Sequence, residues 1–504
     1  MFNLAQHCIA PATALTPDKT ALVVIGDADR PDLAERWTYA ALDEAVRRVA
    51  AGLAAEGFMR GDRIVLRLPN TGDYALMFLG AIAGGFVPIP TSSMLTEAEL
   101  GFLAEDAKAA AVVQALQTGS DDGPAGFRVL GSSAIARFKT CPPLPGFAAT
   151  DAEDPAYMIY TSGTSGRPKG VVHAHRTVLG RIPMHRDWQG LTASDIMLHA
   201  GAFNWSYTLG VGLLDPWACG ATAVLYSGPR DISVWPRLVD SVGASLFAAV
   251  PSLYRQILKY CDLRQRSLPT LRHGLCAGEA LSPAILEIWR SATGKDLYEA
   301  FGMSECSTFV SNRAGIPVRP GSPGMPQRGR PIAVLPLHGG TEPVADGETG
   351  LLAIHRSDPG LMLGYWRRPD EERACFRGDW FVGGDLAAFD ADGYLWHHGR
   401  ADDVMNAGGY RVSPLEVEAA LAGCPGVAEL AVAEHRVRPD VSVIAAYVVR
   451  AEGSEITAGQ ILSAASGRLA AYKCPKQVFF VPGLPRNANG KLLRRQLPTL
   501  GAGA

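Results

Sequence analysis

The sequence predicts an α/β protein with a large N-terminal domain and a small C-terminal one. The chain has 504 residues, 47% of them hydrophobic and 19% charged, so it is long enough to bury several cores and is not a disordered chain. From about residue 38, helical and strand patterns alternate, which is typical of βαβ layers. Between 316 and 400 the pattern changes to short runs separated by Gly and Pro. Such runs predict β-hairpins.

The N-terminal elements can be followed in order. Apolar residues recur every three to four positions over 39–57, which predicts an amphipathic helix. The apolar run at 62–69 predicts a short buried strand, and 73–85 predicts a second helix. Further strand and helix patterns follow without a fixed repeat period, at 109–115, 221–226, 244–260 and 271–278. We therefore expect a large domain of layered βαβ subdomains, completed by a small β-barrel-like region.

A smaller α+β domain is expected to begin just after Gly399-Arg400, so that 1–400 and 401–504 form separate domains. Ser413-Pro414 predicts a helix start, with Ser as the N-cap, Pro at the first helical position and Glu416 three residues after the cap. Two β-rich runs, a helical run and a last strand follow, at 427–435, 441–450, 461–472 and 477–481. No long Ser- or Pro-rich linker separates the two domains, which indicates a short hinge.

Charge and cysteine content exclude several classes of partner and compartment. The 47 Lys and Arg residues against 50 Asp and Glu give a net charge of −3, so nucleic acid is not expected as a partner. Nine cysteines at wide spacings, with no C-x-x-C pair, are typical of reduced thiols in a cytoplasmic protein. We expect no secretory signal at the start of the sequence. The uncharged run 74–96 is interrupted by Gly and Pro, so we expect no integral membrane association.

The segment 158–170, MIYTSGTSGRPKG, places hydroxyls, glycines and one lysine directly after an apolar strand. Such a loop can wrap phosphate oxygens, because glycines let backbone N–H groups approach closely and Lys169 supplies a positive charge. The spacing differs from a Walker A sequence, and Gly170 rather than Ser or Thr follows the lysine. The segment has no G-x-S-x-G nucleophile elbow. Taken alone, a flexible surface turn is an equally open interpretation.

This loop resembles the phosphate loop of the adenylate-forming superfamily, which includes acyl-CoA synthetases, aryl-CoA ligases, luciferases and peptide-synthetase adenylation domains. Further motifs of that family are matched in order across most of the chain, and they are CAGEA (276–280), FGMSE (301–305), GGDL (383–386), GRADD (399–403), GGYRVSP (408–414) and PRNANGK (485–491). Within the superfamily, the chain is most similar to benzoate-type acid–CoA ligases.

The resemblance implies a reaction in two steps. In this family a carboxylic acid is first joined to the α-phosphate of ATP, which releases pyrophosphate and gives an acyl-adenylate. A thiol then displaces AMP. Both steps need developing phosphate charge to be matched by preorganised cations and donors. We therefore expect an ATP-dependent, AMP-forming acid–thiol ligase that uses ATP, Mg²⁺ and coenzyme A.

The resemblance also implies roles for the nucleotide-binding residues. Loop residues are expected to hold the β- and γ-phosphates, and they are Thr161, Ser162, Gly163, Thr164 and Lys169. Glu305 is expected to ligate Mg²⁺. Two segments are expected to lie along the adenine and the α-phosphate, and they are Gly278, Glu279, Ala280 and Phe301, Gly302, Met303, Ser304. Asp385 is expected to accept hydrogen bonds from the ribose hydroxyls, with Arg400 nearby.

Lys491 is the residue predicted to drive the first step, because an ammonium on a mobile domain can bridge the substrate carboxylate and the α-phosphate. Asp402 is the expected hinge around which the small domain turns between the two steps. After that turn, Gly408 and Gly409 are expected to approach the acyl-adenylate and shape the thiol tunnel. Taken alone, the near-terminal Gly-Lys pair reads as a solvated basic face.

The acyl pocket is expected to be formed by an aromatic segment and a residue of the next motif, namely Phe203, Asn204, Trp205, Ser206, Tyr207 and Thr308. Amino-acid-activating relatives have Asp where this chain has Asn204, so an amino acid is disfavoured. We expect an aromatic or similarly compact acid, with a short- or medium-chain fatty acid as the alternative. Since nothing after Lys491 resembles a carrier domain, free coenzyme A is the expected acceptor.

Two other classes remain open. One is an adenylating enzyme that produces light or loads another thiol acceptor, and the other is a non-catalytic nucleotide-binding regulator. A homodimer is also left open. His173, His175 and the pair His397-His398 lack the spacing of a metal site, and Cys306 is expected to pack in the core rather than act as a nucleophile.

Overall fold

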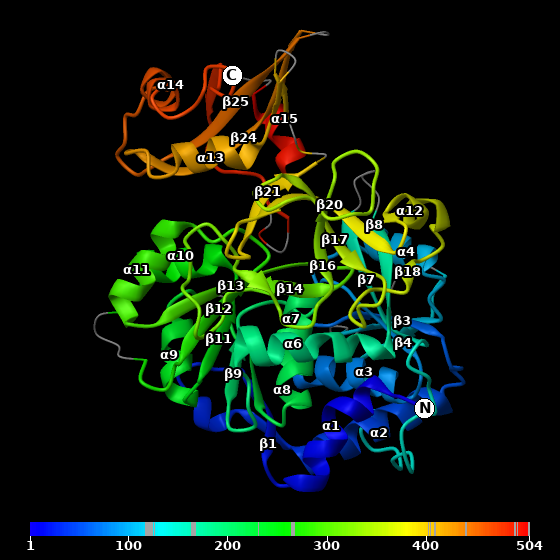
Figure 1. Ribbon diagram of the computed structural model, residues 1–504. Helices are drawn as coiled ribbons and strands as arrows, with labels where there is room; N and C mark the ends of the chain where they lie inside the picture. The colour runs from blue at the N-terminus through cyan, green and yellow to red at the C-terminus, as the bar shows by residue number, and fades with distance from the viewer. Residues whose placement is uncertain are drawn as a thin grey trace. The chain divides into compact units, whose positions relative to one another are not determined.

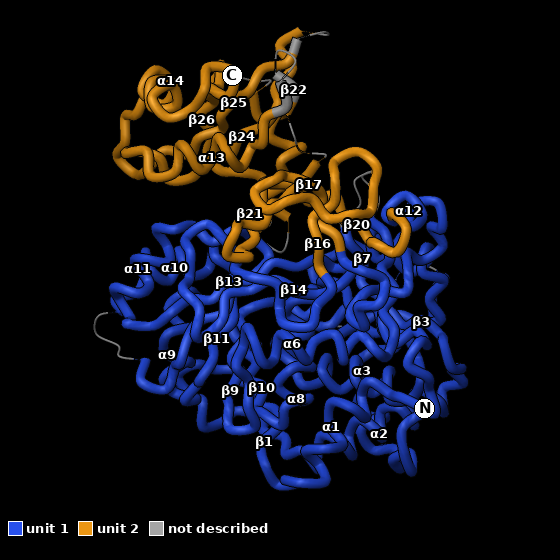
Figure 2. Tube along the Cα trace, viewed as in Figure 1, with its two compact units in different colours: residues 1–331, 354–376 blue, residues 332–353, 377–504 orange. Residues whose placement is uncertain are grey.

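The computed structural model describes residues 1–115, 124, 126–162, 168–229, 231–263, 268–401, 403, 405–407, 410–438, 441–487, 490 and 492–501. The chain divides into two compact units, which Figure 2 shows in different colours. Unit 1 comprises residues 1–331 and 354–376, and unit 2 comprises 332–353 and 377–504. This division places part of the β-rich stretch before residue 400 with the C-terminal segment. A functional boundary near residue 400 stays a prediction.

The central sheet of unit 1 has nine strands in the described part of the chain, and in spatial order they are β15 (Met325–Pro326), β14 (Ser307–Ser311), β13 (Asp296–Met303), β12 (His273–Ala277), β11 (Leu246–Ala249), β9 (Ile196–His199), β10 (Thr222–Tyr226), β1 (Thr20–Ile25) and β2 (Glu35–Thr38). The strands from β13 to β1 run parallel. The order reverses at β9, because β10 lies on one side of it and β11 on the other. In open α/β sheets, ligands bind outside the carboxyl ends of the strands near such a reversal.

Helices cover both faces of this sheet (Figure 1). One face carries α9 (Val234–Val242), α10 (Pro251–Tyr260) and α11 (Pro283–Thr293). The other carries short helical turns, which are α6 (Ile182–Met184), η3 (His185–Gln189), α7 (Ser206–Leu209) and η4 (Gly210–Leu214). Further helical segments of unit 1 are α1 (Leu4–Leu15), η1 (Pro31–Leu33), η2 (His175–Arg181), α8 (Asp215–Ala218) and α12 (Pro369–Ala374).

A second, parallel sheet in unit 1 confirms the predicted alternation. Its strands within the described ranges are β4 (Val87–Pro90), β3 (Arg63–Arg67), β5 (Ala111–Gln114) and β6 (Val129–Leu130). The predicted helices are α2 (Tyr39–Ala55) and α3 (Gly72–Ala83), and α4 (Glu97–Asp106) and α5 (Ser132–Phe138) follow. The 3.6-residue period identified α2 correctly because only one of its faces is apolar.

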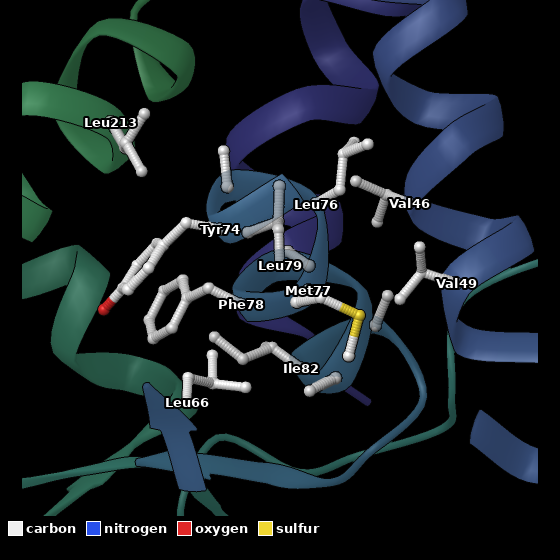
Figure 3. Close-up of a cluster of buried hydrophobic side chains, with 14 of the residues drawn as sticks. Val46, Val49, Leu66, Tyr74, Leu76, Met77, Phe78, Leu79, Ile82 and Leu213 are labelled. Carbon is white, nitrogen blue, oxygen red and sulfur yellow. The ribbon is translucent and has the colours of Figure 1, made fainter. Parts of the chain in front are cut away.

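The core of this region is organised around α3, in which every residue except Asp73 is buried. Figure 3 shows its side chains lying between Val46 and Val49 of α2 and Leu66 of β3. The rings of Tyr74 and Phe78 lie next to each other in this layer. The Tyr74 hydroxyl donates a hydrogen bond to the carbonyl oxygen of Phe203 at 2.9 Å. A core helix thereby fixes one end of the predicted acyl-pocket segment.

The residues on either side of the predicted phosphate loop pair as antiparallel strands, β7 (Pro155–Ser162) and β8 (Pro168–Ala174). The short strand β18 (Gly364–Tyr365) pairs antiparallel with β8. In this register Thr161 lies opposite Lys169. Since β18 brings Tyr365 onto the same sheet, a residue almost 200 positions away becomes a neighbour of the loop.

Unit 2 contains part of the predicted β-rich stretch and the α+β pattern that the sequence predicts after it. Its strands in the described residues are β16 (Ile332–Leu335), β17 (Gly350–His355), β19 (Phe376–Arg377), β20 (Trp380–Phe389), β21 (Leu395–Arg400), β22 (Met405–Ala407), β23 (Tyr410–Val412), β24 (Val427–Arg438), β25 (Val441–Arg450) and β26 (Gln477–Phe480). Strands β17 and β19 also include residues of unit 1. The helical segments are α13 (Pro414–Leu421), α14 (Ala458–Ser466), η6 (Arg494–Gln496) and α15 (Leu497–Leu500). The predicted fold class, α/β with a smaller C-terminal domain, is confirmed.

The predicted start of α13 is confirmed, because Ser413 is the N-cap residue, Pro414 is the first helical residue and Glu416 lies in the first turn. The Ser413 hydroxyl makes no capping bond, however, and donates instead to the carbonyl oxygen of His398 at 2.5 Å. Glu416 pairs with Lys473. The hydroxyl joins β21 to the helix start, and a tertiary contact therefore displaces the local one.

Two further predictions concern the absence of membrane-spanning helices and the presence of reduced cysteines. Within the described ranges, no helix combines the length and apolar character needed to cross a bilayer. None of the nine cysteines, all of which lie within the described ranges, forms a disulfide. Cys306 is fully buried, and burial raises the pKa of its thiol to about 12, so the expectation that it packs in the core is confirmed.

Candidate active site

The predicted adenine segments lie side by side at the carboxyl edge of the central sheet. Strands β12 and β13 are parallel, with Ala277 opposite Ala300. The residues Gly278–Ala280 therefore leave the sheet next to Phe301–Met303, the last residues of β13. The Phe301 ring packs edge-to-face on Phe309, with centroids 5.7 Å apart. The topology thus brings together two motifs that are more than 20 residues apart in the sequence.

Gly278 is the point where this edge meets the aromatic segment. Its φ angle is +91°, which favours glycine. A Cβ atom at this position would lie 2.3 Å from Cη2 of Trp205. The indole of Trp205 therefore packs directly on the glycine backbone. The segment predicted for adenine and the segment predicted for the acid are in contact here.

The turn after β13 carries Ser304 and Glu305, and a buried ion pair stabilises it. Ser307 has a φ angle of +63°, a strained conformation for a residue with a side chain. Its hydroxyl accepts a hydrogen bond from Arg181, whose guanidinium forms two hydrogen bonds with the fully buried Asp215. Burial would raise the pKa of Asp215, but Arg181 and His185 lower it well below its ordinary value. This buried ion pair supports the turn.

Glu305, Tyr365 and Lys169 form a compact cluster. The Tyr365 hydroxyl donates to Oε1 of Glu305 at 2.7 Å, and Nζ of Lys169 lies 3.8 Å from the centroid of the Tyr365 ring. Nζ is also 3.8 Å from Oε2 of Glu371, the third residue of α12. Burial raises the pKa of Tyr365, and the Glu305 carboxylate raises it further, so the phenol remains a donor. Tyr365 both orients the carboxylate and provides an aromatic face for the ammonium.

Sequence analysis missed Tyr365. The only signal is a Gly-Tyr-Trp run at 364–366 in a stretch predicted to form hairpins, and nothing in that run indicates Glu305 as a partner. Of the predicted loop residues, Thr161 and Lys169 face each other across the hairpin and Ser162 ends β7. Gly163 and Thr164 lie outside the described residues.

The backbone of the predicted acyl-pocket segment is fixed from a distant part of the chain. Asn70 donates through Nδ2 to the carbonyl oxygen of Gly201 at 2.5 Å, and its Oδ1 accepts from the backbone N–H of Phe203 at 3.1 Å. Together with Tyr74, it holds both sides of the turn that leads to Asn204. Sequence analysis missed Asn70 and Tyr74, because neither lies in a recognisable motif.

The aromatic residues of this segment point into the protein. Tyr207 is buried, packs edge-to-face on Trp205 with centroids 5.3 Å apart, and donates to the carbonyl oxygen of Ala249 at 3.3 Å. Burial raises the pKa of Tyr207, so its ring is neutral. Ser206 begins α7, and Thr308 on β14 donates to the sulfur of Met184 at 3.3 Å. The predicted pocket residues therefore share one face of the sheet.

Two further polar groups lie beside this segment and were also missed. His199 and Thr208 are buried, and both ring nitrogens of His199 and the hydroxyl of Thr208 have no hydrogen-bond partner among the described residues. A Cβ atom on Gly201 would lie 2.4 Å from the Thr208 hydroxyl and 3.2 Å from Nδ1 of His199. Burial lowers the pKa of His199 to about 3. Buried, neutral polar groups therefore lie beside the predicted acyl-pocket segment.

The predicted ribose-binding residues lie in unit 2. Asp385 on β20 is buried, accepts from Nε2 of His397 at 3.0 Å and lies 3.5 Å from Nη1 of Arg400. Asp385 and Arg400 are directly opposite on β20 and β21. The remaining predicted residues of unit 2 lie outside the described residues, and they are Asp402, Gly408, Gly409 and Lys491.

Within the part of the chain that the structure describes, no three His, Cys, Asp or Glu side chains converge as a metal site. His173 and His175 are buried, and burial lowers their pKa values to about 3 and about 4. Glu305 stays the Mg²⁺ ligand that the family resemblance predicts. One carboxylate is compatible with Mg²⁺, which usually takes one or two carboxylates together with substrate phosphates.

A parallel-sheet edge with glycine turns, next to a carboxylate and a lysine, is typical of a nucleotide-binding enzyme. Two family models match the chain: AMP-binding enzyme over residues 10–366 and AMP-binding enzyme C-terminal domain over 416–491. The chain belongs to the AMP-binding enzyme family. The resemblance to adenylate-forming enzymes is thereby confirmed, as is the predicted class of ATP-dependent, AMP-forming acid–thiol ligase.

Individual relatives agree with this assignment. The 3-hydroxybenzoate–CoA ligase of Aromatoleum sp. (strain CIB) is 30% identical, over 99% of this chain and 97% of the relative. The human mitochondrial acyl-coenzyme A synthetase ACSM3 is 29% identical, over 92% and 83%. The ATP-bound structure of MatB from Rhodopseudomonas palustris superposes with a TM-score of 0.90 at 27% identity, over 99% of both chains.

Proposed function

We propose that the protein joins an aromatic carboxylic acid of the benzoate class to coenzyme A. The observation that carries this proposal is the packing of Trp205 on Gly278, because it places an aromatic face where the adenine and acid segments meet. A flat acid can stack on such a face. The similarity to a 3-hydroxybenzoate–CoA ligase supports the same class of acid.

In the first step, the phosphate loop and its neighbours bind ATP. Thr161, Ser162, Gly163 and Thr164 offer hydroxyl and backbone donors, and Lys169 turns from the Tyr365 ring to the β- and γ-phosphates. Glu305, oriented by the Tyr365 hydroxyl, would hold Mg²⁺. When bound, this ion neutralises negative charge on the phosphates.

The adenosine part of ATP is assigned to two other groups of residues. Phe301 provides an aromatic face for adenine, and the backbone of Gly278–Ala280 lines its edge. Ser304 donates a hydrogen bond to the α-phosphate. Asp385 accepts from the ribose hydroxyls, and its contacts with His397 and Arg400 keep it oriented.

Lys491 completes the first step by neutralising charge between the acid and the α-phosphate, where the new bond forms. The acid carboxylate oxygen attacks the α-phosphorus, and pyrophosphate leaves. Asp402 then serves as the hinge. With Gly408 and Gly409 beside the adenylate, the coenzyme A thiol attacks the acyl carbon and AMP leaves.

The proposal is tested by measuring coenzyme A-dependent AMP release with a panel of acids. Benzoate, hydroxy- and aminobenzoates, cyclohexane carboxylate and C3–C10 fatty acids are compared at equal concentration. We expect the highest kcat/KM with a benzoate. A fatty acid that exceeds every aromatic acid tenfold would instead assign an aliphatic synthetase. AMP that stays bound, with no thioester formed, would indicate a different thiol acceptor.

A further inference from the structure

A cavity lies at the edge of the central sheet opposite the candidate active site. Its volume is about 280 Å³, and it is lined by Arg186, Arg272, Arg313, Arg328, His273 and Asp187. His273 is the first residue of β12, and the cavity therefore lies at the amino ends of the strands. The candidate active site follows the last residues of the same strands. The two sites do not share a residue.

The cavity carries an excess of positive charge. Asp187 has a fully buried side chain that accepts from Arg328 at 2.5 Å and from Arg186 at 3.0 Å, with Arg313 at 3.5 Å. Burial would raise the pKa of Asp187, but its hydrogen bonds to Arg328 and Arg186 lower it to about 2. One carboxylate is thus shared by three guanidinium groups, which have several N–H donors each.

The fourth arginine is paired elsewhere. Nη2 of Arg272 lies 3.0 Å from the buried Asp195 and donates to the carbonyl oxygen of Gly190 at 2.9 Å. The lining therefore has four guanidinium groups and one carboxylate, that of Asp187. When Asp195 is counted as the partner of Arg272, two positive charges remain in excess. Since this excess is next to a cavity, it favours an anion there over a solvated basic face.

A buried imidazole points to the same conclusion independently. His273 is only 8% exposed, and its Nε2 atom has no hydrogen-bond partner among the described residues. Burial lowers the pKa of His273 to about 4, so the ring is neutral. Buried polar atoms without partners are rare in folded proteins. A ligand group that can both accept and donate a hydrogen bond would satisfy it.

We propose that this cavity binds a phosphate group, with Arg313 and Arg328 holding its oxygens and His273 bonded to the same group. Guanidinium groups match phosphate geometry with paired N–H donors. A monoprotonated phosphate also presents a P–OH donor to the imidazole, which sulfate lacks. The volume is just below the range of small-molecule pockets, and this favours a small anion such as phosphate or pyrophosphate, or the phosphate end of a nucleotide. The site is separate from the proposed activity.

The test measures phosphate binding to the full chain while the candidate active site is occupied by a stable sulfamate analogue of the acyl-adenylate. Calorimetry at low ionic strength compares orthophosphate, pyrophosphate, AMP and sulfate. We expect one saturable site that binds at least one phosphate compound at least fivefold more tightly than sulfate. The tightest phosphate compound identifies the source of the group. Equal affinity for sulfate, or no saturable binding, would overturn the proposal.

Variants separate binding from a structural role. R313Q and R328Q are each expected to weaken phosphate binding about tenfold, as expected when a charge-assisted hydrogen bond is lost. R237Q is the matched control, because Arg237 pairs with Asp29 outside the cavity. Arg328 is 61% exposed, so R328Q keeps the test usable if R313Q fails to fold. Equal affinities in R328Q and R237Q would show that the arginines only cross-link the fold.

Discussion

The predicted nucleotide side and the predicted acyl side of the candidate site contain different kinds of side chain. The nucleotide side uses charges at turns and strand ends, where Lys169 and Glu305 meet through Tyr365. The acyl side uses buried, neutral side chains such as Phe203 and Tyr207. Activation of an acid depends on where charge is placed, whereas selection of the acid depends on packing. A substitution on one side should therefore affect catalysis and specificity differently from one on the other.

The largest effect is expected for Lys491→Ala, which removes the positive charge assigned to the new bond between the acid and the α-phosphate. Acid-dependent exchange between pyrophosphate and ATP should fall about 10²–10³-fold. Thioester formation from a supplied acyl-adenylate should stay within about threefold of the wild type. Lys473→Ala is the control, because Lys473 pairs with Glu416. Equal loss in both half-reactions would contradict the division of labour.

Gly278→Ala should affect both sides at once, because a methyl group there would meet Trp205. We expect kcat/KM to fall about 10–100-fold for ATP and for the acid, since backbone strain of ~1–3 kcal/mol is added to a displaced indole. Gly294→Ala has a comparable positive φ of +67° but no atom within 4 Å of the new methyl. The Gly294→Ala variant therefore measures the effect of backbone strain without a steric clash. If both variants lose equal activity, Trp205 does not link the two sides.

Tyr365→Phe should affect only the nucleotide side. It removes the donor to Glu305 and keeps the ring beneath Lys169, so we expect kcat/KM for ATP to fall about tenfold. The Mg²⁺ concentration for half-maximal activity should rise, and the preference among acids should not change. Tyr39→Phe is the control, because it removes the hydrogen bond from Tyr39 to the carbonyl oxygen of Ala221 at 2.6 Å, outside this cluster and outside the segment 158–170. A similar response of Tyr39→Phe would assign Tyr365 a structural role only.

The smallest effect on activity is expected for His199→Gln at neutral pH, but this variant should change the acid stability. The pKa of His199 is about 3 in the folded chain, below the ordinary value of about 6.5. The unfolded chain therefore binds the proton first, and stability falls as pH drops from about 7 towards 3, by up to ~1.4 kcal/mol per pH unit for this group. The difference between the urea midpoints of unfolding at pH 7 and at pH 5 should be smaller in the variant than in the wild type. An unchanged difference would exclude His199 as a source of acid sensitivity.

Local patterns were sufficient to predict the parts of the fold that depend on local physics. The apolar period of α2 and the apolar run before the predicted phosphate loop are patterns of consecutive residues, and the structure has a helix and a strand at these positions. Tyr365, Asn70 and Tyr74 could not be found this way, because their roles depend on pairing between distant strands and helices. The helix start at Ser413 was predictable from its local pattern, but the bond of the Ser413 hydroxyl to the His398 carbonyl on β21 was not, because that contact is tertiary.

The division of the chain into two units could not be predicted from local patterns either. Residues 332–353 belong to unit 2 although they precede residues 354–376 of unit 1. The chain crosses between the units three times in this stretch, and two of the crossings lie within β17 and β19. Composition therefore does not mark them. Motif order predicts which chemistry is present, but the partners of each motif depend on tertiary contacts.

The most direct test of the central claim is a crystal structure of the protein with ATP and Mg²⁺. We predict nucleotide density at the carboxyl ends of β12 and β13, with adenine against Phe301 and the metal ion coordinated by Glu305, which keeps its hydrogen bond from Tyr365. ATP bound elsewhere on the chain, or a metal ion coordinated without Glu305, would contradict the account.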